Sequence, residues 1–314
     1  GFKIVSGGAD YTNRAKAHTY LIEALLYGNI ALLYDKAYLF TEEHEDAINF
    51  DFVGNTKDYK QVMAYAIKKI DEAIKLIEAD EIDKDPSAVI AGVTFDRATL
   101  LQFANSMGAR FLACNPRTQA ENAQVDWAKV KTYAEKGLQQ DFKVAYDDGW
   151  RGKVMTRDYG SNYYGQHHGN NFRGSQWLLS KMAPNDPASV YPIPVTEGSD
   201  SFKDWPAITN CPDARLEKYF KYETMRNWYG ADRTTRPGYG TFILCQYRYM
   251  RYYNVVNLNS GFIDHFLKVE NDTYLAEALI RTSGSKSEIA RLINNSRVGI
   301  GQLPALTGNE SYDE

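Results

Sequence analysis

Apolar residues recur at helical spacing through the first 138 residues of the chain. Four stripes repeat every three or four positions, which is the period of one face of an α-helix. They predict four helices, over residues 12–29, 57–79, 94–113 and 126–138. Because only turns separate these helices, the pattern indicates helix pairs packed in series, as in a tetratricopeptide-like solenoid.

Local residues predict where these helices begin and end and which way their faces point. Gly28 and Asn29 are expected to stop the first helix, and Thr94 is expected to cap the third. In the second helix, Lys69 falls outside the apolar stripe, on the polar face. A further pair of short amphipathic helices is predicted over 272–297, with Asp272 as its N-cap.

Residues 140–268 have a different character, because prolines and glycines concentrate in stretches such as "APNDPASVYPIPV" and "RPGYG". Helical periodicity is limited there to short pieces such as "DARLEKYFKYE", and "TFILCQYRYMRYYNVV" fits a strand pair or a short helix equally well. Long loops in a compact protein are usually functional or disordered. The sequence therefore predicts one mainly α-helical domain, with residues 12–138 and 272–297 as scaffold and residues 140–268 as a loop-rich ligand region.

Composition removes several classes of function. The net charge of −4 provides no basic field for nucleic acid. The three cysteines are far apart and form no CxxC pair, which argues against a disulfide framework or a structural zinc site. No segment is long and apolar enough to cross a bilayer. The first ten residues also lack the pattern of a signal peptide.

Sequence motifs for catalysis are equally sparse. His167 and His168 are adjacent, so on an extended chain they point to opposite faces and rarely share a metal. There is no GxSxG elbow and no glycine-rich phosphate loop. The expectation is a protein with no cofactor, no metal and no enzymatic activity. A glycoside hydrolase stays open as an alternative, because its two carboxylates need not be close in sequence.

Two loop segments combine aromatic rings with amides and arginines: "RDYGSNYYGQHHGNNFRGSQW" (157–177) and "RNWYGADRTTRPGYG" (226–240). Flat rings can cover the apolar face of a sugar, while amide and guanidinium groups bind its hydroxyls. The alternative is that the rings fix long loops to the helical body. The residues predicted to bind ligand are Trp177, Trp228, Tyr163, Tyr164, Tyr229, Asn171 and Arg173.

Five segments in order resemble helices of the SusD/RagB family. They are "AKAHTYLIEALLYGNIALLYD", "DYKQVMAYAIKKIDEAIKLI", "TFDRATLLQFANSMGARFLACN", "DWAKVKTYAEKGL" and the late pair "DTYLAEALIRT" with "IARLINNSRVGIGQLPAL". The resemblance covers both helical parts, and the middle loops match no pattern of the family.

This resemblance implies a lipid-anchored protein on the outside of the outer membrane. Such a protein captures an oligosaccharide and delivers it to a SusC-like TonB-dependent transporter, without chemistry. A RagB-like member that binds peptides is the alternative within the family. The family also has a signal peptide, a lipid-bearing cysteine and further C-terminal sequence, so the chain is expected to be shortened at both ends.

Overall fold

The structure is a computed structural model that describes residues 3–41, 51–80, 95–146, 174–192, 206–222, 247–251 and 261–312. The chain divides into two compact units. Unit 1 consists of residues 1–142, 266–293 and 306–314, and unit 2 consists of residues 143–265 and 294–305.

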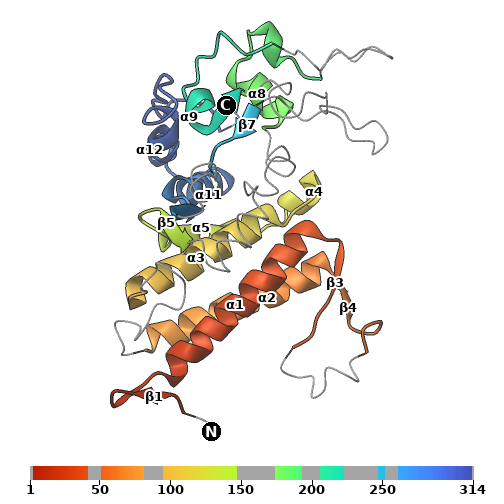
Figure 1. Cartoon of the computed structure of the whole chain (residues 1–314), viewed down its shortest axis with the longest axis vertical. Coiled ribbons are helices and arrows are strands. Elements are labelled where there is room, and N and C mark those ends of the chain that lie inside the picture. Colours follow the sequence, from red (N-terminus) through yellow and green to blue (C-terminus); the bar gives the residue numbers. More distant parts are fainter. Residues whose placement is uncertain are drawn as a thin grey trace. The chain divides into compact units, whose positions relative to one another are not determined.

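Unit 1 begins with two long helices that run side by side (Figure 1). These are α1 (Thr12–Leu33) and α2 (Tyr59–Glu78). Asp58 caps α2 in a complete capping box, because its carboxylate accepts from the Gln61 N–H at 2.9 Å and the Gln61 side chain accepts from the Asp58 N–H. A short ribbon of β3 (Lys36–Tyr38) and β4 (Thr56–Asp58) connects the two helices.

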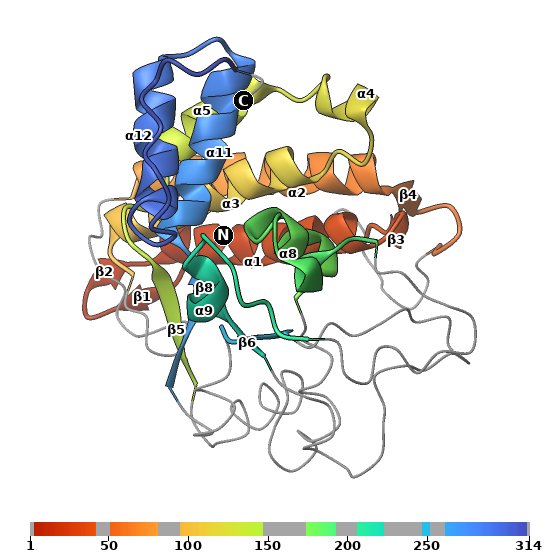
Figure 2. The ribbon, with the colours of Figure 1, turned by 90° about the horizontal axis from the view of Figure 1, so that it is seen from above.

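The next helices of unit 1 extend this arrangement. They are α3 (Arg97–Cys114), α4 (Gln119–Asn122), α5 (Trp127–Glu135) and α11 (Lys268–Arg281). Helix α3 packs against α2 and α5, and α11 packs against α5 and α3 (Figure 2). Helix α12 (Lys286–Arg297) follows α11, and the two share an apolar cluster that includes Leu279 and Leu292. The chain therefore forms consecutive packed helix pairs.

Strands in the described parts of the chain form only two-stranded sheets. Besides β3 and β4, the pairs are β1 (Val5–Ser6) with β2 (Ala9–Asp10), β5 (Phe142–Tyr146) with β8 (Gly261–Phe266), and β6 (Phe220–Tyr222) with β7 (Tyr247–Tyr249). Unit 2 also contains α8 (Gln176–Met182), the 3-10 helix η1 (Pro187–Ser189) and α9 (Arg215–Tyr219).

The predicted mainly helical fold of packed helix pairs is confirmed. The segment "DARLEKYFKYE" is helical over α9 and then becomes β6, and residues 247–249 of the ambiguous "TFILCQYRYMRYYNVV" stretch form a strand. The rest of that stretch lies outside the described residues, as does Thr94. The carboxylate that caps α3 is Asp96, which accepts from the Thr99 N–H at 2.6 Å.

Three local predictions are wrong. Helix α1 continues through Gly28 to Leu33, because Gly28 is a packing site: a Cβ there would lie 2.3 Å from Phe111 Cε2. Asp272 does not cap α11, because the helix begins four residues earlier, at Lys268. The carboxylate of Asp272 is buried and pairs with the ammonium of Lys268 in the first turn of the same helix, at 2.5 Å.

Lys69 is the third correction, since its side chain is only 1% exposed. Its ammonium lies 4.3 Å from the centroid of the Tyr20 ring and 3.5 Å from a Glu23 carboxylate oxygen. A buried charge requires such partners. Helix α1 packs on α2 along its length. At Lys69, the part of α2 that lies outside the apolar stripe therefore faces α1 and not solvent.

Candidate functional site

Trp177 is the one predicted ligand residue that lies in the described part of the chain. It is the second residue of α8 in unit 2, and it is 53% exposed. The opposite side of the short helix is anchored, because Leu179 is fully buried and Met182 is 8% exposed, in a cluster with Leu216. The ring is therefore presented to solvent from a backbone that packs against an apolar core.

A buried carboxylate fixes the chain that follows α8. Asp186 accepts from the N–H groups of Ala188, Thr209 and Asn210 at 2.7–2.8 Å. Burial acts to raise the pKa of Asp186, but the hydrogen bonds from these donors outweigh it and hold the pKa below its usual value. The carboxylate of Asp186 fixes the loop by accepting these hydrogen bonds. Because its oxygens are already used in this way, it does not fit the role of a general acid or base.

Exposed apolar side chains surround Trp177 in the sequence and the structure. The Gln176 amide donates to the carbonyl oxygens of Ala188 at 3.0 Å and Val190 at 3.4 Å, which ties the chain after η1 to the start of α8. Tyr191 follows this junction directly and is 56% exposed. Trp177, Leu178, Val190 and Tyr191 are all exposed on α8 and on the segment bonded to its start, and they are here called the α8 surface.

Tyr191 was missed by sequence reasoning, although it lies in the proline-rich stretch "APNDPASVYPIPV" of the predicted ligand region. The signal that marks it is a large ring between Val190 and Pro192, in a proline-rich segment of the predicted ligand region. The other predicted ligand residues, as well as His167 and His168, lie outside the described residues. They are Trp228, Tyr163, Tyr164, Tyr229, Asn171 and Arg173.

A cation lies beside the Trp177 ring. The ammonium of Lys181, one turn further along α8, is 5.9 Å from the ring centroid. That distance is at the outer limit of a cation–π contact. The α8 surface thus offers an aromatic face and a single positive charge.

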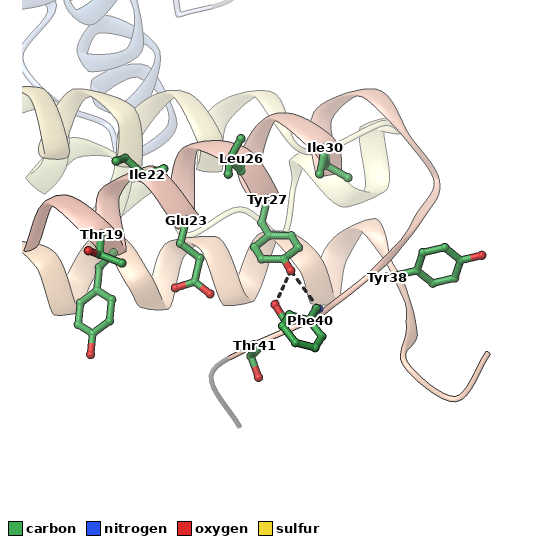
Figure 3. Close-up of a pocket in the computed structure, with 10 residues that line it drawn as sticks. Thr19, Ile22, Glu23, Leu26, Tyr27, Ile30, Tyr38, Phe40 and Thr41 are labelled. Atoms are coloured by element: carbon green, nitrogen blue, oxygen red, sulfur yellow. Dashed lines mark hydrogen bonds between the residues drawn. The ribbon is translucent and has the colours of Figure 1, made fainter. Parts of the chain in front are cut away.

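Unit 1 contains a hollow of about 830 Å³ along the outer side of α1 (Figure 3). The Tyr27 hydroxyl forms one wall, since it donates to the Phe40 carbonyl at 2.5 Å and accepts from the Phe40 N–H at 3.0 Å. Burial raises the pKa of Tyr27. The lining is mainly apolar, and no sequence pattern pointed to it. The lining residues are Thr19, Tyr20, Ile22, Glu23, Leu26, Tyr27, Ile30, Tyr38, Phe40 and Thr41.

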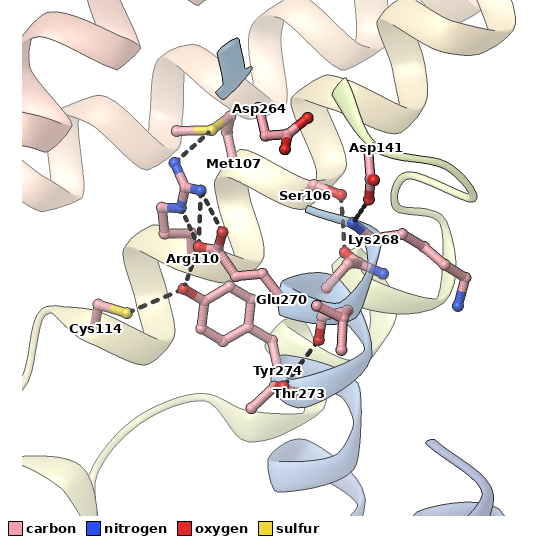
Figure 4. Close-up of polar contacts among 12 residues, drawn as sticks. Ser106, Met107, Arg110, Cys114, Asp141, Asp264, Lys268, Glu270, Thr273 and Tyr274 are labelled. Carbon is pink, nitrogen blue, oxygen red and sulfur yellow. Dashed lines mark hydrogen bonds and ion pairs between the residues drawn. The ribbon is translucent and has the colours of Figure 1, made fainter. Parts of the chain in front are cut away.

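A polar cluster joins α3 to α11 in unit 1 (Figure 4). The Arg110 guanidinium donates to both carboxylate oxygens of Glu270, at 2.7 and 2.8 Å, and lies 4.0 Å from the Phe266 ring centroid. Tyr274 donates to the same carboxylate at 2.9 Å and approaches the Cys114 sulfur at 3.4 Å. Desolvation by its neighbours raises the pKa of the Cys114 thiol, although the residue is exposed, and the cluster joins the two helices through an ion pair and hydrogen bonds.

The described histidines, cysteines and carboxylates form no group of three or more that could hold a metal ion. Among the helices that the structure describes, none combines the length and apolar character needed to cross a membrane.

The described parts of the chain are thus helix pairs in unit 1 and a loop-rich unit 2 with an exposed tryptophan. No family model matches the sequence, and no curated protein matches it. The fold is similar to the crystal structure of a SusD-like carbohydrate binding protein from Bacteroides vulgatus ATCC 8482, with 14% identity and a TM-score of 0.47. It is also similar to a laminarin binding SusD-like protein, with 17% identity and a TM-score of 0.43.

Both of these proteins are longer than the chain. The matches cover 96% and 94% of this chain, but 57% and 66% of the two similar chains. Both are SusD-like proteins, the family that the five sequence segments resemble.

Proposed function

We propose that this protein binds an oligosaccharide at the cell surface and delivers it to a SusC-like TonB-dependent transporter of the outer membrane. The full-length protein would be held there by a lipid anchor. The observation that carries the proposal is the half-exposed Trp177 ring on the firmly packed helix α8. The five family-like helices of the sequence and the packed helix pairs of unit 1 support the same proposal.

The α8 surface suits a sugar because a pyranose has an apolar C–H face and a rim of hydroxyls. Exposed rings and aliphatic side chains favour contact with that face, since covering them removes apolar area from water. We expect the rings predicted in residues 157–177 and 226–240 to complete the surface, with Asn171 and Arg173 binding hydroxyls.

Binding without hydrolysis is favoured by the state of the two buried carboxylates in the described part of unit 2. Asp186 accepts several N–H groups, and Asp213 is held by Arg215 through contacts of 2.6–3.0 Å. The Arg215 contacts outweigh burial and hold the pKa of Asp213 below its usual value. Neither group is the protonated acid that glycoside hydrolysis requires.

The outer side of α1 supports the proposal of a transporter partner. Ile22 and Leu26, which are 52% and 61% exposed, line the hollow of Figure 3, and Leu33, which is 75% exposed, lies further along the same helix. Exposed apolar side chains of this kind are typical of a protein interaction surface. Unit 1 would thus bind the transporter while unit 2 binds the ligand.

The experiment is a panel of polysaccharides and peptides, with retention and product release measured together. We expect retention of a glycan without release of reducing ends. Trp177→Ala should weaken that binding by about ten- to a hundredfold, by analogy with the loss of one stacked ring. Phe262→Ala is the matched control, because Phe262 is an equally exposed ring of unit 2, at 62%, in strand β8.

Three results would contradict the proposal. Release of reducing ends would identify a hydrolase, and retention of peptides alone would identify a RagB-like peptide binder. If Trp177→Ala lowers the melting temperature sharply and leaves affinity unchanged, the ring is a structural anchor and the binding surface lies elsewhere.

A further inference from the structure

Trp177 and Lys181 lie one turn apart on the exposed side of α8, and this arrangement bears on ligand choice. The ammonium of Lys181 is exposed and 5.9 Å from the ring centroid. It forms no ion pair with any carboxylate in the described residues. A sugar that contacts the ring would therefore lie close to a positive charge that no described carboxylate pairs with.

The nearby acidic groups do not neutralise this cation. Asp186, the only acidic residue between Gly174 and Pro192, is 4% exposed and is used by the N–H groups of Ala188, Thr209 and Asn210. Asp213 is likewise buried and bound to Arg215. As far as the described residues go, the charge of Lys181 is thus left for a bound group to pair with.

A purely structural role for Lys181 is weakly supported. The cation–π contact is at the outer limit of the effective range. The helix is already held by the burial of Leu179 and Met182 and by the hydrogen bonds of Gln176. Removing the ammonium should therefore change the stability of unit 2 very little.

We propose that the α8 surface prefers an anionic sugar, with Trp177 stacked on the sugar ring and the Lys181 ammonium paired with its carboxylate or sulfate. The exocyclic carboxylate of a uronic acid projects from the rim of the ring, as does a sulfate ester. The ammonium is 5.9 Å from the centroid of the Trp177 ring, so either group of a sugar on that ring can come within ion-pair distance of it. This inference rests on the proposed glycan-binding function and names the class of its ligand.

The test compares oligosaccharides that differ only in charge. Oligomers of galacturonate, glucuronate and mannuronate are each measured by calorimetry against their neutral methyl esters, at low salt. An exposed ion pair contributes up to about 1 kcal/mol, so we expect the best-bound acid to exceed its ester by about two- to fivefold. The preference should fade near 1 M salt, where the screening length is only about 3 Å. A sulfated and a desulfated galactan form a second arm, which separates sulfate from carboxylate recognition.

Variants assign the effect to the proposed residue. Lys181→Gln should reduce acid affinity to that of the ester and leave ester affinity unchanged, while Lys181→Arg should retain the preference. Lys218→Gln removes the same charge from an exposed position on α9 and should have no effect. Trp177→Ala should weaken the acid and the ester equally.

The inference and the proposed function fail in different ways. Equal affinity for every charged and neutral pair, or an acid preference that survives Lys181→Gln, overturns the inference and leaves glycan binding intact. The same holds if only neutral glycans bind. If no glycan in either charge state is retained by the unmodified protein, both the inference and the proposed function are overturned.

Discussion

Replacing Gly28 with alanine tests how α1 packs against α3. Two effects of opposite sign compete. Alanine is favoured over glycine inside a helix by up to about 1 kcal/mol. Against this, the new Cβ would lie 2.3, 2.4 and 2.7 Å from three carbons of the Phe111 ring, far inside van der Waals contact.

The overlap should dominate because the ring has no free space. Phe111 is fully buried, so it cannot move toward solvent. Overpacking of a dense core typically costs about 1–3 kcal/mol. After subtraction of the gain in helix propensity, we expect Gly28→Ala to lower the free energy of unfolding by about 1 kcal/mol.

The measurement is urea unfolding followed by far-ultraviolet circular dichroism, in a double-mutant cycle with Phe111→Leu. The smaller side chain lacks the two closest of the three clashing atoms, Cε2 and Cζ, so Gly28→Ala should be less harmful in that background. Asn29→Ala is the matched control, because its side chain is exposed and bonds only to the Leu25 carbonyl at 2.7 Å. If Gly28→Ala is neutral or stabilising in both backgrounds, the close contact between the helices is refuted.

Other predictions concern the remaining packing and interaction sites. Glu270→Gln should destabilise unit 1 by about 1–3 kcal/mol in thermal unfolding, because it weakens a charge-assisted pair with the half-buried Arg110. The control is Glu288→Gln, which removes an exposed ion pair with Arg291 and should change stability by less than about 0.5 kcal/mol. The pKa of Asp186 is lower in the folded protein than the ordinary carboxyl value of about 4, so its ionised form stabilises the fold. This stability is fully present above the ordinary value and is lost as the pH falls through the pKa of the folded state. Asp186→Asn should therefore flatten the acid limb of the stability curve, and a parallel acid limb would contradict this. Leu26→Arg should leave the melting temperature unchanged and abolish co-purification with the proposed SusC-like transporter, and an unchanged complex would remove the outer side of α1 from the proposed interface.

The scaffold was largely predictable because its helices are amphipathic, and periodicity reports which face is buried. The errors arose where one residue serves two purposes. Gly28 has the character of a helix stop and of a packing site, and only the position of Phe111 distinguishes them. Lys69 looked solvent-exposed because a polar residue outside the stripe usually is, and its burial depends on Tyr20 and Glu23 of another helix.

The candidate site was harder to predict because a ring in a loop has no periodicity to show whether it is buried. Trp177 was identified by composition alone, and its exposure follows from the burial of its helix neighbours. Tyr191 became visible only through the Gln176 bond that ties its chain to α8. The hollow beside Tyr27 depends on a hydroxyl-to-backbone contact that no local pattern encodes.

The anchoring of α8 has a consequence for how ligands are distinguished. Binding must offset the ordering of any side chain or loop that moves. A tryptophan on a helix already fixed by Leu179 and Met182 loses little freedom when a sugar covers it. Stacking on such a ring is strong but common to most pyranoses, since nearly all present an apolar face. Discrimination must therefore come from groups beside the ring, and in the described part of unit 2 the cation that contacts the ring is Lys181, 5.9 Å from its centroid.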